Sequence, residues 1–358
     1  MTRTARAANF AARAALALLL LALFLPRAAG ADENTWVGKY PPLSEVYRQV
    51  RELAAARPDV ATVEEIGKSV EGRAILMLHV GRHDGVTRPA ALYTANIHAG
   101  ECISSQVALG MARRLILDDG HDPEITVLLD KTDVFIVPVL NPDGYYRVIS
   151  TGGSGGPGGG RKNAHGVDLN RNYPLAPGAH SRHPLAGNRR PRSSYYMGPE
   201  QLSEPETQAI ARLADAHAFY VAINGHSVSG KFLYPHCYTK KDAVHTDKMI
   251  QVGRAFAAHQ KKPYEVEKSY SWYPTLGDMD DFLYMQHGVL SNTVEHATLG
   301  GTLPYFLLHP RTFWLMNPPD PEPWVQNDRD AVIAAIAEAL AITGGQPMPL
   351  AETRTSGQ

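Results

Sequence analysis

The amino-acid sequence predicts a layered α/β fold with a largely parallel or mixed sheet. Short apolar runs typical of strands alternate with longer segments in which apolar residues recur every three or four positions. Apolar residues make up 44% of the 358 residues, which is enough for a full hydrophobic core. No repeat or linker divides the patterned region, so we expect one domain over residues 38–344 and a disordered tail over 345–358.

The first expected element is an amphipathic helix. Val46, Val50 and Leu53 would share one of its faces, with Ser44 as N-cap and Pro58 as a stop. Two strands joined through Gly67–Gly72 should follow, within residues 61–81.

The same alternation continues to the end of the domain. Ser203 and Glu206 have the spacing of a capping box at a helix start. An Asn-Pro-Asp-Gly turn should end one strand at residues 141–144. Further strands are expected at residues 90–97, 133–140, 219–224 and 288–294, and further helices at 102–120, 203–218, 248–260 and 328–342.

The amino-terminal residues have the layout of a secretory signal peptide. Three arginines and no acid precede the apolar run 14–25, and Ala29–Ala31 supplies small residues for cleavage. A run of 12 residues is short for a bilayer span, although an uncleaved anchor is the alternative. We therefore expect residues 1–31 to be removed and the mature protein to be secreted or periplasmic, monomeric and not inserted in the membrane.

Net charge and cysteine content constrain the possible partners and disulfides only weakly. A formal net charge of −1 gives no reason to expect nucleic acid as a partner. Export would permit a disulfide between Cys102 and Cys237, but spacing alone does not establish one, and two free, partly buried thiols are an equal alternative.

The stretch TANIHAGECIS raises the question of a metal site. It places His98 and Glu101 three positions apart, directly after an expected strand. The same H-x-x-E spacing recurs at His121 and Glu124, in a turn-like stretch with no strand before it. The spacing alone is therefore weak support for a metal site.

Two further strand ends strengthen the hypothesis. His226 follows one strand in VAINGHS, and Glu295 ends another in LSNTVEH. In open α/β sheets, sites gather beyond the carboxyl ends of strands, where side chains distant in sequence can converge. Two imidazoles and one carboxylate are typical of catalytic zinc, which lowers the pKa of bound water and polarises a carbonyl. Glu295 could take the proton of that water.

A polar segment could hold the substrate. In GRKNAHGVDLNRNYP, Arg171 could grip a carboxylate together with Asn170, and Arg161 could stabilise an oxyanion. The alternative is a polar loop with its charges in water. The basic loop at residues 177–194 is most simply a solvated surface.

Taken together and in order, the motifs NIHAGE, NPDGY, RKN, GVDLNRNYP, SEPET, INGHS and TVEH resemble zinc carboxypeptidases of the metallocarboxypeptidase A/B (funnelin, M14-type) family. The resemblance runs from GKSVEGR to VEHATLGG, nearly the whole mature chain. It implies a three-layer α/β/α sandwich with a mixed, mostly parallel eight-stranded sheet, and one Zn²⁺ per chain.

The resemblance also implies a role for each matching residue. The metal ligands for Zn²⁺ would be His98, Glu101 and His226, and Asp168 would orient the first zinc histidine. Glu295 would be general base and then general acid, and Arg161 would stabilise the oxyanion. Asn170 and Arg171 would bind the substrate's terminal carboxylate, and Tyr273 would close over the substrate. The family's tryptophan before the Arg-Lys pair is missing here, where a glycine-rich insertion (151–160) stands, so Arg147 is the alternative to Arg161.

The expected function is that of a secreted metallocarboxypeptidase acting on peptides or proteins with a free C-terminus. The resemblance puts Asp280 near the position that lines the family's side-chain pocket, where an acid would favour C-terminal Lys or Arg. An Asp280 turned to solvent or bonded in its loop is the alternative. Other functions left open are a cell-wall peptide endopeptidase or amidase, a deacylase, and a metal-free binding module.

Overall fold

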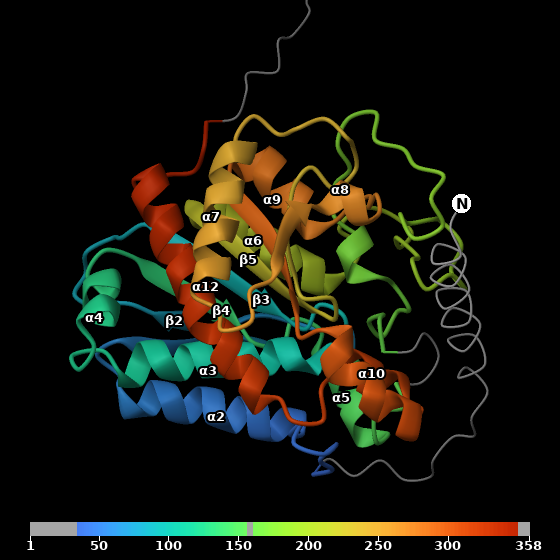
Figure 1. Cartoon of the computed structure of the whole chain (residues 1–358), viewed down its shortest axis with the longest axis horizontal. Coiled ribbons are helices and arrows are strands. Elements are labelled where there is room, and N and C mark those ends of the chain that lie inside the picture. The colour runs from blue at the N-terminus through green and yellow to red at the C-terminus, as the bar shows by residue number, and fades with distance from the viewer. Residues whose placement is uncertain (1–33, 156–159, 350–358) are drawn as a thin grey trace, which may run out of the picture.

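A single eight-stranded sheet runs through the computed structural model, with helices on both faces (Figure 1). The structure describes residues 34–155 and 160–349. The expected signal peptide lies outside the described residues, as do residues 350–358 of the expected tail. The three-layer α/β/α architecture and the eight-stranded mixed sheet are confirmed.

The sheet has the strand order β1-β2-β4-β3-β5-β8-β6-β7. Its central pairs, from β4 through β3 and β5 to β8, are parallel, and the pairs β1–β2, β2–β4 and β6–β8 are antiparallel. The strands are β1 (Ala61–Lys68), β2 (Ala74–Val80), β3 (Ala90–Ala95), β4 (Asp133–Val137), β5 (Phe219–Ser227), β6 (Lys231–Tyr234), β7 (Glu265–Lys268) and β8 (Leu290–His296).

The helices form the two outer layers. The larger layer contains α2 (Leu43–Ala56), α3 (Cys102–Leu117), α7 (Thr246–Ala258) and α12 (Glu322–Thr343), and the opposite layer contains α6 (Pro205–Ala216) and α9 (Met279–His287). Shorter helices are α4 (Pro123–Leu129), α5 (Pro142–Ser150), α8 (Ser269–Trp272), α10 (Leu299–Leu308) and α11 (Thr312–Met316).

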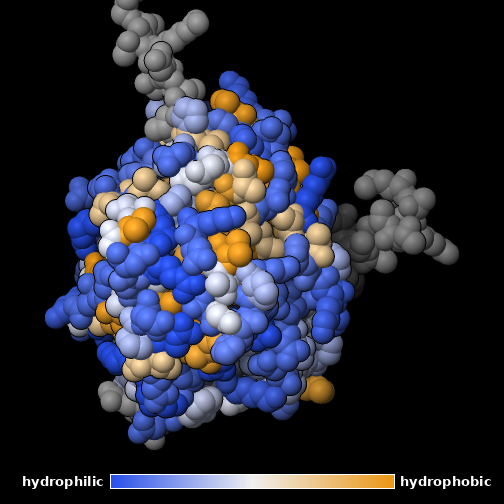
Figure 2. Space-filling view, turned by 90° about the vertical axis from the view of Figure 1, so that its left-hand side faces the viewer, coloured by the Kyte–Doolittle hydropathy of each residue, from blue (hydrophilic) through white to orange (hydrophobic). Residues whose placement is uncertain are grey.

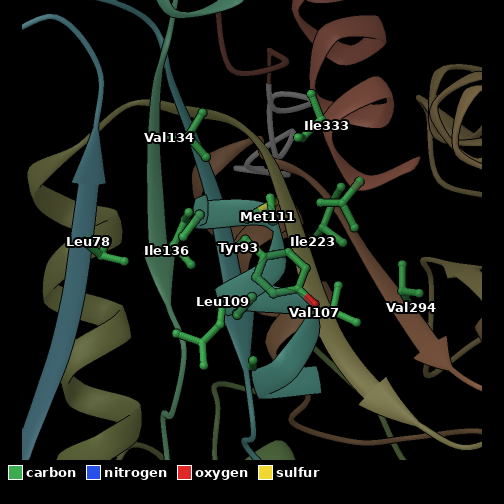
Figure 3. Close-up of a cluster of buried hydrophobic side chains, with 14 of the residues drawn as sticks. Leu78, Tyr93, Val107, Leu109, Met111, Val134, Ile136, Ile223, Val294 and Ile333 are labelled. Carbon is green, nitrogen blue, oxygen red and sulfur yellow. The ribbon is translucent and has the colours of Figure 1, made fainter. Parts of the chain in front are cut away.

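The main core lies between the sheet and α3 and α12. Val107 and Met111 of α3 pack towards Tyr93 of β3 and Ile223 of β5, and Ile333 of α12 joins them (Figure 3). The central strands β3 and β5 are buried along their whole length because helices cover both faces. This packing holds the carboxyl ends of the parallel strands in fixed positions.

Strand register places two predicted site residues side by side. In the parallel pair β5–β8, His226 is the direct partner of Glu295. Partners across parallel strands point to the same face of a sheet. Both residues lie at the carboxyl ends of their strands, as the sequence predicts.

Several local predictions are wrong. Helix α2 begins one residue before Ser44, and the extended Pro42 occupies the N-cap position without a side-chain capping bond. Helix α6 has no side-chain cap, since Ser203 and Glu206 bond instead to Glu204 and Asn163. The Asn-Pro-Asp-Gly segment starts helix α5 rather than ending in a turn, because the Asn141 side chain accepts the N–H of Gly144.

The folded elements also extend beyond two of the predicted borders. Helix α12 begins six residues before the expected start at 328. Met348 is buried, and its N–H donates to the Gly288 carbonyl, so the packed chain continues beyond residue 344. At the glycine-rich insertion, the Gly153 backbone lies close against the Phe313 side chain.

The surface and the cysteines complete the description. Cys102 and Cys237 are both free and buried. Among the described residues, no helix is long and apolar enough to cross a bilayer. The face over α4 is mostly hydrophilic, with hydrophobic side chains gathered in patches (Figure 2).

Candidate metal centre and substrate pocket

Three potential metal ligands meet at the carboxyl end of the sheet. His98 and Glu101 lie where the chain passes from β3 into α3, and His226 lies in β5. His98 Nδ1 is 2.9 Å from Glu101 Oε1, and His226 Nδ1 is 3.0 Å from Glu101 Oε2. One ligand atom from each residue lies within 4.8 Å of the other two, and all three side chains are buried. The fold thus joins the three predicted ligands.

The electrostatics of this triad favour a bound cation. His98 Nε2 is 3.3 Å from Asp168 Oδ1, so the ring's proton belongs there and Nδ1 presents a lone pair. The two Nδ1 atoms of His98 and His226 lie 3.2 Å apart. Burial alone would raise the pKa of Glu101, but the two histidines outweigh burial and lower that pKa. Burial lowers the pKa of His226. A carboxylate and two imidazoles form a donor set that fits Zn²⁺.

Asp168 and Arg161 lie next to the triad and support it. Arg161 Nε donates to Asp168 Oδ2 at 2.7 Å. Burial alone would raise the pKa of Asp168, but Arg161, Arg171 and the His98 bond hold it well below its usual range. Asp168 therefore stays ionised and orients the His98 ring. Arg161 Nη2 is buried and has no hydrogen-bond partner among the described residues, so it can still donate.

Glu295 faces the triad from β8. Its carboxylate is buried, and Oε2 has no hydrogen-bond partner in the described part of the chain. Burial first, and then the negative charge of Glu101, raise the pKa of Glu295 well above its usual value. A carboxylate in this environment binds a proton readily, as a general base must.

Arg171 is a buried cation without a carboxylate partner among the described residues. Its side chain is 1% exposed. Its guanidinium donates only to carbonyl oxygens, to Leu185 from Nη2 at 3.0 Å and to Asn170 from Nη1 at 2.6 Å. The Asn170 side chain accepts the N–H of Met279, which fixes it beside the arginine. A buried guanidinium that contacts only carbonyls is suited to binding an anion from outside the chain.

One cavity of about 300 Å³ is lined by nine of the ten predicted site residues. Asp168 is the exception, because it lies behind His98. Tyr273 follows α8 at the cavity wall, its ring stacked on His183 with centroids 6.1 Å apart. The alternative residue Arg147 lies on α5, 3.4 Å from Glu71, and does not line the cavity. His121 and Glu124 are exposed beside α4, consistent with a chance match.

Asp280 lies in the cavity wall but is firmly bonded. Its carboxylate accepts from Ser291 Oγ at 2.7 Å, from Thr293 Oγ1 at 2.6 Å, and from the Asn224 amide. Burial first, and then the nearby Asp278, raise the pKa of Asp280 to about 7. Asp280 thus lines the cavity while its buried carboxylate is hydrogen-bonded to its neighbours.

Sequence reasoning missed several lining residues. Asp278 and Cys237 line the same wall as Asp280, and Tyr195 lies under Arg161, 4.8 Å from its guanidinium carbon. Asp278 stands in the same GDMDD stretch as Asp280 and could have been noticed there. Nothing in the sequence around Tyr195 signals its position, which depends on the path of a long loop.

Residues 46–314 match the family model described as zinc carboxypeptidase. Carboxypeptidase A4 of Mus musculus is 32% identical over 262 residues, which cover 69% of this chain and 60% of that protein. Carboxypeptidase B of Homo sapiens is 29% identical over 284 residues, covering 73% of this chain and 64% of that protein. The matched region thus spans somewhat less than two thirds of these relatives' length.

A solved structure shares the architecture. The carboxypeptidase A of Helicoverpa armigera superposes with a TM-score of 0.71 at 23% identity, over 87% of this chain and 76% of that chain. At this level of identity, the likeness shows the fold alone.

Proposed function

Because the chain belongs to the zinc carboxypeptidase family, a family of hydrolases, we propose that it removes the last residue of peptides or proteins with a free C-terminus. The observation that carries this proposal is Arg171. A free C-terminus ends in a carboxylate, and a buried guanidinium at the cavity wall would pair with it.

The cavity residues divide the reaction between them. Arg171 and Asn170 hold the terminal carboxylate, which sets the last peptide bond beside Glu295. Glu295 takes a proton from the attacking water and returns it to the leaving amine as the C–N bond breaks. The free N–H of Arg161 stabilises the oxyanion that forms on the carbonyl oxygen. Tyr273 covers the bound substrate from the edge of the cavity.

His98, Glu101 and His226 would hold one Zn²⁺. When bound, the metal supplies a Lewis acid that polarises the carbonyl and acidifies water. Asp168 keeps His98 in the tautomer that presents Nδ1 to the metal.

Asp280 favours a C-terminal Lys or Arg. Its carboxylate lines the cavity, and Asp278 adds a second acid to the same wall. Two buried carboxylates close together need a cation or a proton to compensate them. A basic side chain in the cavity would supply that cation.

The residues at the amino terminus support export. The arginine-containing start and the apolar run 14–25 fit a signal peptide over residues 1–31, so we place the enzyme outside the cytoplasm, secreted or periplasmic, as a monomer.

The test is cleavage of matched peptides ending in Phe, Leu, Lys, Arg or a C-terminal amide, with and without a zinc chelator. We expect chelator-sensitive release of single residues from the free tails, fastest for Lys and Arg, and almost none from the amide. Undiminished cleavage of the amide would replace the exopeptidase with an endopeptidase or amidase, such as one acting on cell-wall peptides. No cleavage at all would leave a deacylase or a binding module.

A further inference from the structure

A surface next to the cavity carries positive charge that nothing in the described chain neutralises. Between Leu169 and Pro199 the sequence contains five arginines and no acid. One of them is the buried Arg171. The other four are exposed and form what we call the basic rim: Arg182, Arg189, Arg190 and Arg192. Within the described ranges, none of the four makes an ion pair.

The loop that carries the basic rim is attached to the cavity. It is the lime loop at the right of Figure 1, near α8. Its Leu185 carbonyl accepts from Arg171, and Leu185 itself lines the cavity. His183 stacks on Tyr273. At its far end, Tyr195 lies under Arg161 in the cavity wall.

A further contact joins the rim to the oxyanion side of the cavity. Lys162, next to Arg161, donates from Nζ to the Pro191 carbonyl at 3.0 Å, between Arg190 and Arg192. This ammonium also makes no ion pair in the part of the chain that the structure describes. The loop that carries the rim is therefore anchored to the cavity wall at several points, although the rim arginines themselves do not line the cavity.

The cavity and its rim differ in charge. Four carboxylates and two arginines line the interior, whereas the four rim residues are all cations. A peptide whose last residue occupies the cavity must leave past the rim, and four extended residues reach about 14 Å. Neighbouring cations without counter-ions repel one another, and an anionic ligand relieves that repulsion.

On the basis of the proposed function, we propose that the basic rim binds acidic side chains upstream of the cleaved residue. The preferred substrates are peptides with Asp or Glu in the few positions before the C-terminal residue. A peptide is favoured over another polyanion because the rim adjoins the buried carboxylate-binding Arg171. The charges of the rim raise affinity and association rate without touching the scissile bond.

The test uses peptides that share a C-terminal lysine and carry four upstream Glu, Gln or Lys residues. For the unmodified enzyme we expect kcat/KM to be about three- to ten-fold higher with Glu than with Gln, through KM. The advantage should shrink as salt rises from 0.01 to about 0.5 M, because exposed charges are screened.

The deciding variant is Arg189→Gln/Arg190→Gln/Arg192→Gln. It should lose the preference for Glu and cleave the Gln peptide as before. The matched control, Arg51→Gln/Arg113→Gln/Arg254→Gln, removes the same charge from exposed positions on α2, α3 and α7 and should keep the preference. A preference that survives in the rim variant, or disappears equally in the control, overturns the proposal.

A binding measurement separates this inference from the proposed function. Fluorescence anisotropy of the same labelled peptides on Glu295→Gln needs no turnover. Tighter binding of the Glu peptide, lost in the rim variant, supports the rim even if the enzyme cleaves none of these tails. Equal binding of the Glu and Gln peptides overturns it, and so does a single-stranded oligonucleotide that binds the rim as tightly as the Glu peptide.

Discussion

Arg171 is the residue whose environment is hardest to explain without a ligand. A buried guanidinium loses hydration, and carbonyl oxygens replace only part of what water supplied. The side chain nevertheless stays at 1% exposure in the cavity wall. Its neighbour Asp168 stabilises the charge through space but bonds to Arg161 and His98 instead. A terminal carboxylate would complete the bonding of Arg171.

Replacing Arg171 should therefore separate free tails from blocked ones. For Arg171→Ala we expect kcat/KM on free-tailed peptides to fall about 30-fold or more, since losing one partner of a buried charge pair costs about 2–5 kcal/mol. The slow background on amidated peptides should barely change. Steady-state kinetics on both substrates measure this, with the exposed Arg254→Ala as control. Equal losses on both substrates would contradict a carboxylate-binding role.

Asp280 should give the enzyme a pH dependence that depends on the substrate. Burial and Asp278 raise its pKa to about 7, so the carboxyl is protonated below that pH and ionised above it. A cationic side chain binds the ionised form. The KM for peptides ending in Lys should therefore fall as pH rises from 6 to 8, whereas the KM for peptides ending in Leu should lack this component.

The comparison of the two substrates removes effects common to both. Asp280→Asn should make the two KM profiles parallel and slow the release of C-terminal Lys about ten-fold or more, where a ten-fold change corresponds to about 1.4 kcal/mol. If the pH profiles of KM for the Lys and Leu peptides already coincide in the unmodified enzyme, Asp280 does not interact with the charge of the substrate's side chain.

At the scale of elements, the sequence predicts the site better than the segments around it. His98 follows β3, and His226 and Glu295 lie at the carboxyl ends of β5 and β8; the convergence of parallel strand ends is a general property of α/β sheets. The strands β6 and β7 were missed because four residues are too few to show an alternation. The start of α5 was missed because Asn and Pro serve equally in turns and at helix starts.

A buried polar network secures the end of β8 from the other side. His296, next to Glu295, bonds to Asp328 of α12 through Nδ1 at 2.7 Å. The Tyr264 hydroxyl donates to the same carboxylate and accepts the N–H of Ala297, each at 2.9 Å. Ala297 has φ +62°, an uncommon conformation for a side chain with a Cβ. These bonds fix the backbone two residues beyond the proposed general base.

Removing the Tyr264 hydroxyl should affect both stability and turnover. Tyr264→Phe leaves the Ala297 N–H without its partner and takes from Asp328 Oδ2 one of its two bonds, the other being that of His296, which costs about 1–3 kcal/mol of unfolding free energy. Because the Glu295 backbone loosens, we expect kcat to fall several-fold with KM unchanged. Urea unfolding and steady-state kinetics measure the two effects. Tyr220→Phe, which loses a buried hydroxyl bonded to Thr132, should lose stability without the change in kcat.

At the scale of the whole molecule, the proposed metal centre would link distant segments of the chain. His98 and Glu101 lie at the junction of β3 and α3, and His226 lies in β5, more than a hundred positions later. The unfolded chain does not hold these ligands near one another. A metal that binds only the folded arrangement therefore stabilises the entire domain by mass action.

Removing the metal should accordingly lower the melting temperature of the domain. With free Zn²⁺ at about 1,000 times its Kd, the stabilisation is about 4 kcal/mol. For a domain of this size, each kcal/mol corresponds to about 2–4 °C, so a chelator should lower Tm by about 8–16 °C. Differential scanning calorimetry with and without chelator measures the shift.

In His98→Ala the chelator should have little effect, because a triad with one imidazole binds zinc weakly. In His121→Ala, which alters the other H-x-x-E pair, the full shift should remain, since that pair is exposed and belongs to neither potential metal cluster of the described residues. An equal chelator shift in His98→Ala would mean that the stabilising metal sits elsewhere.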